Sequence, residues 1–353
     1  MSPDAGVPFA GAIRPGNEAA DGVRALLKPL LPYLEREGVT DLVVNRPGEV
    51  GVHVKGSWEW NEESSLDFNR LMAIARGLAG TANQQINQKT PACAAVLPDG
   101  QRAQILIPPA TLAGHVSITI RRPPSRLWSL DELKEGGTFQ YVRKGGYWGS
   151  EQAGQEVLSA LYQQQDWMGF LAKAVAYRQN IVISGATGSG KTSLARALLA
   201  HIPDHERIIT GEDTHELVGL PQRNKVHLLY PQDAGQSATT IGAKDLMVAA
   251  LRMRPDRILF PELRDGTAYY FLRSVASGHP GVITTIHASS CDVAWETLTL
   301  LVRECPEARG LAREDIGSLL RAMVDVVVQM EVRGDRHEVI EVQYTRLIDG
   351  GKR

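Results

Sequence analysis

A glycine-rich segment in the middle of the chain has the residue types and spacing of a phosphate-binding loop. Residues 185–192, GATGSGKT, match the pattern G-x-x-x-x-G-K-[ST] between the apolar run IVIS and an amphipathic run that starts at Lys191. Glycines at positions 185, 188 and 190 let the backbone bend so that successive N–H groups and the N-terminus of the next helix face anionic oxygens. We therefore expect a nucleotide-binding loop formed by Gly185, Ala186, Thr187, Gly188, Ser189, Gly190, Lys191, Thr192 and Ser193.

Two side chains at the end of this loop have the chemistry for phosphoryl transfer. Lys191 is expected to reach the β- and γ-phosphates of the nucleotide, and the hydroxyl of Thr192 is expected to bind the Mg²⁺ that bridges them. The predicted cofactors are accordingly ATP and Mg²⁺. A chance glycine-rich turn is the alternative, and the strand-like and helix-like flanks argue against it.

Acidic residues follow two other strand-like runs. Glu212 and Asp213 come after RIIT, with Glu216 further on, and Glu262 comes after RILF. ATP hydrolysis needs carboxylates near the γ-phosphate, either to hold Mg²⁺ through water or to orient the attacking water. In a parallel α/β sheet, ligands bind at the carboxyl ends of the strands, which is where both segments fall. We expect Glu262 to hold Mg²⁺ together with Thr192; a capping or surface role is the alternative for any one of these acids.

Two histidines flank a further strand-like run, GVITTI. His287 directly follows this run, where its side chain could sense the γ-phosphate and relay its presence to neighbouring elements. His279 lies in a Gly-His-Pro-Gly loop, where a simple turn is an equally good interpretation. A lone histidine is more often structural than functional, so neither assignment rests on the residue type alone.

The elements that must position these residues are arranged as two domains. The chain has 353 residues, of which 43% are hydrophobic, enough for two packed domains at roughly 150 residues each. Residues 18–121 contain helix-like runs, one of them interrupted by prolines, and short strand-like runs with a hairpin signal over 41–55, which together predict a smaller α+β domain. Residues 1–17 are expected to form a flexible tail, and residues 122–154, with their Pro and Gly pairs, a linker.

The second domain, residues 155–353, has a different pattern. A helical run ending near Arg178 is followed by the strand-like runs IVIS, RIIT, VHLLY, RILF and GVITTI, with helices between several of them. Strands alternating with helices predict an α/β fold with a mostly parallel sheet whose faces are covered. Beyond about residue 311 the pattern predicts a helix and then a β-hairpin that turns at Gly334–Asp335.

The overall composition narrows the class of protein. Lys and Arg total 38 against 40 Asp and Glu, a formal net charge of -2, which gives no electrostatic reason to expect nucleic-acid binding. The cysteines form no C-x-x-C pair, which argues against a disulfide framework and a four-thiolate zinc site; they are Cys93, Cys291 and Cys305. No apolar run reaches the roughly 18 residues of a membrane span, and the first residues lack the pattern of a signal peptide, so we expect a cytoplasmic protein.

Four segments together carry a family resemblance. GATGSGKT, EDTHEL, RMRPDRILFPELRD and SGHPGVITTIHA, in this order, resemble the Walker A, Asp box, Walker B and His box of the hexameric traffic ATPases of type IV secretion and conjugation systems, part of the larger secretion ATPase superfamily. The resemblance is strong from about residue 155 to residue 290 and weaker in the N-terminal portion. The type II and pilus-assembly branch commonly carries a four-cysteine zinc module, which three dispersed cysteines cannot form, so the type IV branch is favoured.

The resemblance implies a RecA-like P-loop ATPase domain, preceded by the smaller α+β domain, with ATP bound between the two. It implies an ATP-hydrolysing homo-hexameric motor that powers assembly of, or substrate transfer through, a type IV secretion system. Components of a membrane-embedded secretion machine are the implied partners, and the implied location is peripheral at the inner membrane. The residues that the family's motifs mark as catalytic are Lys191, Glu212 of the Asp box, Glu262 of Walker B, His287 of the His box, and the N-terminal-domain arginines Arg102 and Arg121.

Two departures from the family's motifs leave other functions open. The family usually has glycine before the Walker B glutamate, where this chain has Pro261, and an aliphatic residue before the Asp box, where this chain has Gly211. A nucleotide-gated assembly factor with weak hydrolysis is therefore one alternative. A RecA-like nucleic-acid motor is the other, because LRMRPDR together with Arg264 forms a local basic cluster; the resemblance instead favours subunit contacts or nucleotide communication for Arg252, Arg254 and Arg257. Direct nucleic-acid binding is not expected.

Overall fold

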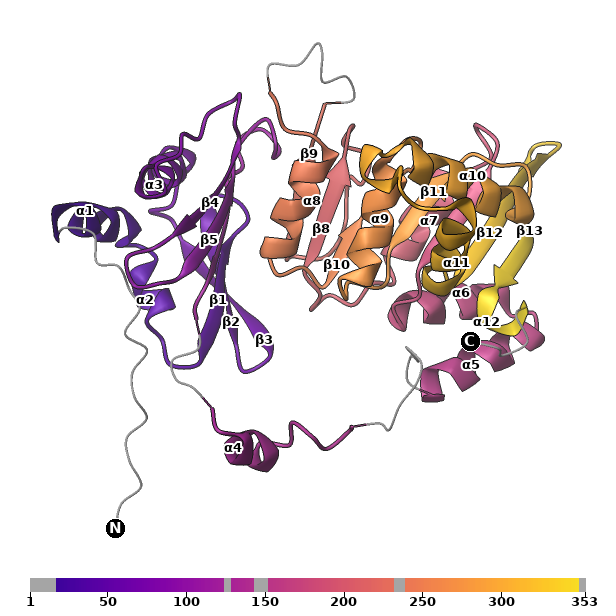
Figure 1. Cartoon of the computed structure of the whole chain (residues 1–353), viewed down its shortest axis with the longest axis horizontal. Helices are drawn as coiled ribbons and strands as arrows, with labels where there is room; N and C mark the ends of the chain where they lie inside the picture. Colours follow the sequence, from indigo (N-terminus) through magenta and orange to yellow (C-terminus); the bar gives the residue numbers. More distant parts are fainter. Residues whose placement is uncertain (1–16, 124–127, 143–151, 232–238, 349–353) are drawn as a thin grey trace.

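The computed structural model describes residues 17–123, 128–142, 152–231 and 239–348 (Figure 1). Most of the predicted tail and parts of the predicted linker lie outside these ranges. Within the linker, a short helix, α4 (Leu130–Glu135), begins with a capping box formed by Ser129 and Glu132. No helix among the described residues is long and apolar enough to cross a membrane.

The N-terminal half forms an antiparallel six-stranded sheet with helices packed against it (Figure 1). The strand order is β3-β2-β1-β6-β5-β4. The bounds are α1 (Asn17–Leu27), α2 (Leu31–Leu34), β1 (Val39–Val44), β2 (Gly48–Val54), β3 (Ser57–Glu63), α3 (Phe68–Thr81), β4 (Ala92–Val96), β5 (Arg102–Leu106) and β6 (Ser117–Arg121). The first helix ends before Pro29, as the prolines predict. Strand β3 is an addition that the hairpin signal did not include.

The C-terminal half is an α/β domain whose strands form two hydrogen-bonded sheets. β10-β8-β9 are parallel, as are β11-β7-β12, and β13 joins β12 as an antiparallel edge. A single bridge between Glu262 and Thr285 connects the end of β10 to β11. The bounds are β7 (Ile181–Gly185), β8 (Ile208–Glu212), β9 (Lys225–Leu229), β10 (Arg257–Leu259), β11 (Ile283–Ile286), β12 (Val326–Arg333) and β13 (Arg336–Tyr344).

Helices cover both faces of the layer that these two sheets form (Figure 1). The domain therefore has three layers, with the strands between two layers of helices. Alternating residues of β7 show the two faces: Val182 packs in one hydrophobic cluster, whereas Ile181 and Ile183 pack in the other. The predicted helical run before Arg178 is two helices, with Gln165 at φ 57° between them. The bounds are α5 (Gln152–Gln163), α6 (Trp167–Ala176), α7 (Lys191–Leu199), α8 (Ala243–Arg252), α9 (Thr267–Ala276), α10 (Cys291–Glu304), α11 (Arg313–Met323) and α12 (Thr345–Ile348), with a 3-10 turn at Pro306–Ala308.

The two halves share a buried polar contact. The guanidinium of Arg207, directly before β8, is fully buried and donates to Asn45 Oδ1, just after β1, at 2.8 Å and to Thr119 Oγ1, in β6, at 3.2 Å. Leu106 and Ala110 of the N-terminal half pack in a hydrophobic cluster of the C-terminal domain. Side chains of both halves therefore fill one continuous contact region.

Two arginines of the basic run pair with carboxylates of this chain. Arg254 pairs with Asp41 at 3.1 Å and lies 5.3 Å from the ring centroid of Trp58, both in the N-terminal sheet. Arg257 is 0% exposed and pairs with Glu206 at 2.5 Å. A direct subunit contact, one of the two roles expected for these side chains, is therefore excluded for Arg257, whose charge is neutralised inside its own domain.

Candidate nucleotide-binding site

The glycine-rich loop connects β7 to α7, at the carboxyl end of the parallel strands. Gly188 and Gly190 have φ values of 76° and 91°, which side-chain-bearing residues adopt only with strain. A Cβ on Gly185 would lie 2.6 Å from the carbonyl oxygen of Met330, so a larger residue would displace the loop or β12. The predicted glycines are thus required by this backbone path.

Lys191 lies inside the curve of the loop. Its Nζ donates to the carbonyl oxygens of Gly185 at 2.9 Å and Ala186 at 2.8 Å, and the residue is 7% exposed. Burial lowers the pKa of Lys191, and the charge of Glu262 partly opposes that shift. A phosphate entering the loop would compete with these two carbonyls for the ammonium group.

His287 joins Lys191 to Glu262. Nε2 of His287 lies 3.1 Å from Oε1 of Glu262, and Nδ1 lies 3.4 Å from Nζ of Lys191. A tautomer that carries its proton on Nε2 would donate to Glu262 and accept from Lys191. The structure therefore brings together three predicted residues from the loop, from the end of β10 and from the end of β11.

Exposed groups surround this trio. Ala186, Thr187 and Gly188 are exposed, as are Thr192 and Ser193 in the first turn of α7. The hydroxyl oxygen of Ser189 is buried and has no hydrogen-bond partner among the described residues. Exposed backbone at a helix N-terminus, a free hydroxyl and a partly exposed carboxylate form a donor set that suits a nucleotide and Mg²⁺.

Glu212 has a different environment from Glu262. It is 0% exposed, and its Oε2 accepts backbone N–H groups of Glu216 at 2.8 Å and Leu217 at 2.9 Å. Its Oε1 accepts from the hydroxyl of Thr210 and lies 2.9 Å from Nδ1 of His227. Burial alone would raise the pKa of Glu212, but these hydrogen bonds outweigh it and hold the pKa below its usual value. The carboxylate faces the loop after β8 and β9, not residues 185–192.

Arg264, which the sequence placed only in a basic cluster, is a further member of the site. Its guanidinium pairs with Asp213 and lies 4.0 Å from Oε2 of Glu262. Its position two residues after the Walker B acid was the available signal. Arg264 thus connects Asp213, in the loop that follows β8, to Glu262.

Comparison with known proteins decides the family. A family model described as "Type II/IV secretion system protein" matches residues 150–342. The type IV secretion system protein VirB11 of Bartonella quintana is 42% identical over 337 residues, which cover 93% of this chain and 94% of that protein. The crystal structure of the VirB11 ATPase from the type IV secretion system of Brucella suis has a TM-score of 0.84 and 40% identity, and the match covers 91% of this chain and 97% of that one. The chain belongs to the VirB11 family of type IV secretion ATPases.

PtlH of Bordetella pertussis, also a type IV secretion system protein, is 39% identical over 321 residues that cover 90% of this chain and 94% of that protein. The predicted RecA-like ATPase domain, the preceding α+β region and the assignment to the type IV branch are therefore confirmed. The VirB11 relationship also makes the chain an ATPase of a type IV secretion system.

One of the two departures from the VirB11-family motifs has a steric explanation. A Cβ on Gly211 would lie 3.2 Å from Cε1 of Phe260, which packs on it from the neighbouring strand end and is 4% exposed. The missing side chain at position 211 therefore makes room for the ring of Phe260. Gly211 and Phe260 are therefore sterically complementary.

The second departure, Pro261, leaves the strand pairing around Glu262 in place. The carbonyl oxygen of Pro261 accepts from both N and Oγ1 of Thr285, each at 3.1 Å, and the N–H of Leu263 donates to the carbonyl of Thr285 at 2.9 Å. Proline has no N–H, so this pairing cannot continue through residue 261 toward β10. The break between the two hydrogen-bonded sheets lies at this point.

Arg102 and Arg121 lie apart from the glycine-rich loop in this VirB11-family chain. They face each other across β5 and β6 and are both exposed. Arg121 lies 3.8 Å from Asp41, and in the described ranges neither arginine has a hydrogen bond or an ion pair with the loop, Glu262 or His287. The predicted contact of these arginines with the nucleotide phosphates is not formed within the chain in this arrangement.

Proposed function

We propose that this chain hydrolyses ATP with Mg²⁺ as a homo-hexameric ring, and that the ring drives assembly of, or transfer through, a type IV secretion machine at the inner membrane. The contact series Lys191–His287–Glu262 carries the proposal. It joins the lysine of the glycine-rich loop to an acid at a strand terminus, as hydrolysis at a γ-phosphate requires.

The residues at the loop have separate tasks in this proposal. Backbone N–H groups of residues 186–190 and the ammonium of Lys191 hold the phosphates. Thr192 and Glu262 hold Mg²⁺, which when bound neutralises charge on the phosphate oxygens. Glu262 also orients the attacking water, and His287 keeps that carboxylate aligned by donating from Nε2. Glu212 acts as a positioning residue that fixes the loop carrying Asp213.

The ring gives Arg102 and Arg121 a route to the nucleotide. Their guanidinium groups are exposed on the N-terminal sheet, where they can approach phosphate only after a domain movement or from an adjacent subunit. In this proposal the guanidinium groups reach the γ-phosphate only when the N-terminal sheet has moved toward the glycine-rich loop. Such a contact would couple hydrolysis to movement of the N-terminal domain.

Steady-state ATPase activity against protein concentration tests the proposal, with light scattering to give the mass of the assembly. We expect turnover per chain to rise with formation of a six-subunit particle, and Lys191→Ala to abolish it, whereas Lys173→Ala on the exposed side of α6 keeps it. Turnover that is independent of assembly, or that persists in Lys191→Ala, would contradict the proposal.

A further inference from the structure

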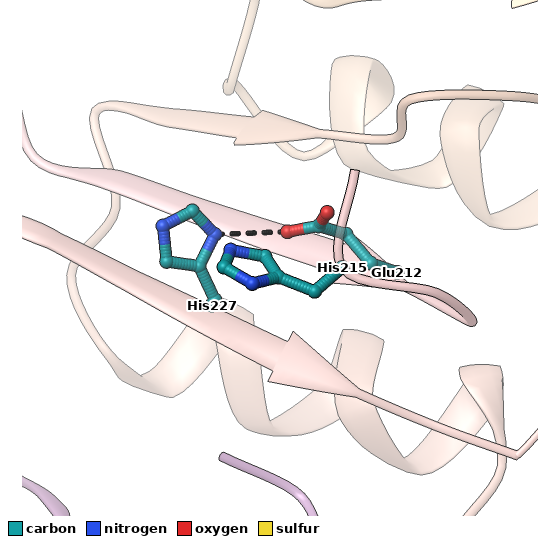
Figure 2. Close-up of side chains that lie close together, drawn as sticks. All are labelled: Glu212, His215 and His227. Carbon is teal, nitrogen blue, oxygen red and sulfur yellow. Dashed lines mark hydrogen bonds and ion pairs between the residues drawn. The ribbon is translucent and has the colours of Figure 1, made fainter. Parts of the chain in front are cut away.

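Three potential metal ligands gather beside the nucleotide site. Glu212 ends β8, His215 lies in the loop that follows, and His227 lies in the middle of β9 (Figure 2). Each offers one ligand atom, and these atoms all lie within 4.8 Å of one another. The two imidazole rings meet edge to face, with centroids 4.5 Å apart. Ligands from three backbone segments therefore converge on one point.

The polar atoms of this cluster are buried, and one of them is unsatisfied. Glu212 is 0% exposed and His227 is 7% exposed. Nε2 of His215 is buried and has no hydrogen-bond partner among the described residues. A buried polar atom without a partner is destabilising and usually has an explanation, such as an ion or a water molecule. No hydrogen bond among the described residues therefore explains why His215 Nε2 is buried at this position.

The carboxylate of Glu212 is already held as a metal ligand would be. Its Oε2 accepts the N–H groups of Glu216 and Leu217, and the hydroxyl of Thr210 also contacts the group. Outer hydrogen bonds of this kind orient a ligating carboxylate. Oε1 itself accepts from the hydroxyl of Thr210 and lies 2.9 Å from Nδ1 of His227.

A cavity of about 190 Å³ gives an ion and solvent access to the cluster. His215 and His227 line it, together with His115 from the N-terminal half. Its two cationic side chains are engaged elsewhere: Arg46 pairs with Glu49 at 3.0 Å, and Nζ of Lys225 donates to carbonyl oxygens of the preceding loop at 2.7 and 2.9 Å. Neither ammonium nor guanidinium charge is therefore directed at the cluster.

We propose that Glu212, His215 and His227 form a binding site for a divalent transition-metal ion, with Zn²⁺ the best match and solvent in the fourth position. Two imidazoles and one carboxylate are a typical zinc donor set, whereas Mg²⁺ and Ca²⁺ prefer oxygen ligands alone. Tetrahedral bonds of about 2.1 Å place ligand atoms roughly 3.4 Å apart. On binding, the distance between Glu212 Oε1 and His227 Nδ1 would therefore increase slightly from 2.9 Å, and the imidazole of His215 would move toward the other two ligands.

The bound ion would fix the loop after β8 to β9. Asp213, next to Glu212, pairs with Arg264, which lies beside Glu262. A metal at this position therefore holds the segment that reaches the nucleotide site, without itself contacting nucleotide. This inference adds a second metal site to the proposed ATPase and does not depend on hydrolysis.

Zn²⁺ titration of the full chain, freed of metal and without a histidine tag or nucleotide, tests the site. Isothermal calorimetry is expected to give one equivalent of Zn²⁺ per chain, unaffected by excess Mg²⁺, and Co²⁺ is expected to give the visible absorption of a four-coordinate ion. Saturating Zn²⁺ should raise the melting temperature by about 5 °C or more, because an ion that binds only the folded state stabilises it.

Variants of the histidines supply the controls. His215 has no hydrogen bond among the described residues, so His215→Asn should fold with the metal-free melting temperature of the wild type and bind Zn²⁺ at least ~10-fold more weakly. His227→Gln should show the same loss of affinity. His115→Gln removes a histidine that lines the cavity outside the cluster and should bind as the wild type does. Absence of one-equivalent binding in the wild type, retention in His215→Asn, or an equal loss in His115→Gln would overturn the assignment.

Discussion

Nε2 of His287 lies 3.1 Å from Oε1 of Glu262, so the histidine is in direct contact with the Walker B acid. The other ring nitrogen faces Nζ of Lys191 at 3.4 Å. When phosphate draws the ammonium away from the loop carbonyls, the contact between Lys191 and His287 changes. We therefore expect the position of His287 beside Glu262 to depend on the occupancy of the phosphate loop.

Replacing His287 should separate catalysis from binding. We expect His287→Ala to lower kcat about 10–100-fold, because Glu262 loses the side chain that aligns it, and to change the Kd for ATP less than about threefold. Steady-state kinetics and nucleotide titration measure the two quantities. His201→Ala, at an exposed position after α7, is the control. A rise in Kd with an unchanged kcat would show that His287 serves binding instead.

The exposed arginines of the N-terminal sheet give a second prediction. Arg102→Ala and Arg121→Ala should each lower kcat by about 10-fold or more, since a guanidinium that reaches transferring phosphate contributes strongly to the rate. Both side chains are exposed, so the melting temperature should change little. Arg76→Ala on α3, also exposed, is the matched control for loss of charge. Wild-type turnover in both variants would remove these arginines from the site.

Replacing Pro261 tests whether this proline lowers the rate of ATP hydrolysis. We expect Pro261→Gly to change kcat less than about threefold, because the carbonyl that Thr285 contacts is retained and Glu262 keeps its contact with His287. Steady-state ATPase assays at equal states of assembly provide the comparison. An increase of 10-fold or more would instead favour a nucleotide-gated assembly factor whose hydrolysis the proline limits.

The buried pair Arg257–Glu206 predicts how stability depends on pH. Burial alone would raise the pKa of Glu206, but the hydrogen bond and charge of Arg257, with those of Arg178, hold it below its usual value. A carboxyl with a depressed folded pKa contributes stability above its unfolded pKa of about 4.3, and this contribution is lost as pH falls through the folded value.

Glu206→Gln should therefore be less stable than the wild type at pH 7 by about 3 kcal/mol, since Arg257 would be left buried without its counter-ion. Its free energy of unfolding should also fall less between pH 5 and pH 3. Urea unfolding at several pH values measures both effects. Glu59→Gln, which breaks an exposed pair with Arg36, should change stability by less than about 1 kcal/mol. Parallel pH curves for the wild type and Glu206→Gln would contradict this account.

Local patterns predicted most of the elements, because their signals are short in range. The glycine-rich loop, its flanking strand and helix, and the final hairpin each depend on neighbouring residues. Strand β3 was missed, although Trp58 and Trp60 alternate with polar residues in SWEWNEE, because the run has no aliphatic residue that would pack in an apolar core. Their rings pack instead against Arg254 and Arg223, at 5.3 and 4.8 Å, partners that lie far away in the sequence.

The environments of single charged side chains were the hardest part to predict. Glu212 and Glu262 both follow strand-like runs and have the same chemistry, yet one is enclosed by hydrogen bonds and the other faces Lys191 through His287. Arg257 lies in an apparent basic cluster, but Glu206 and backbone carbonyls surround it. These differences arise from tertiary packing, which the order of residue types does not encode locally.

Glu262→Gln tests the central claim most directly, because the substitution removes the carboxylate charge while keeping the size of the side chain. Single-turnover hydrolysis, ATP affinity and assembly mass should be measured on the same preparation. We expect ATP binding and the six-subunit particle to be retained and the rate of hydrolysis to fall at least ~100-fold. Hydrolysis at the wild-type rate in Glu262→Gln would contradict the assignment of Glu262, and with it the account of the Lys191–His287–Glu262 series.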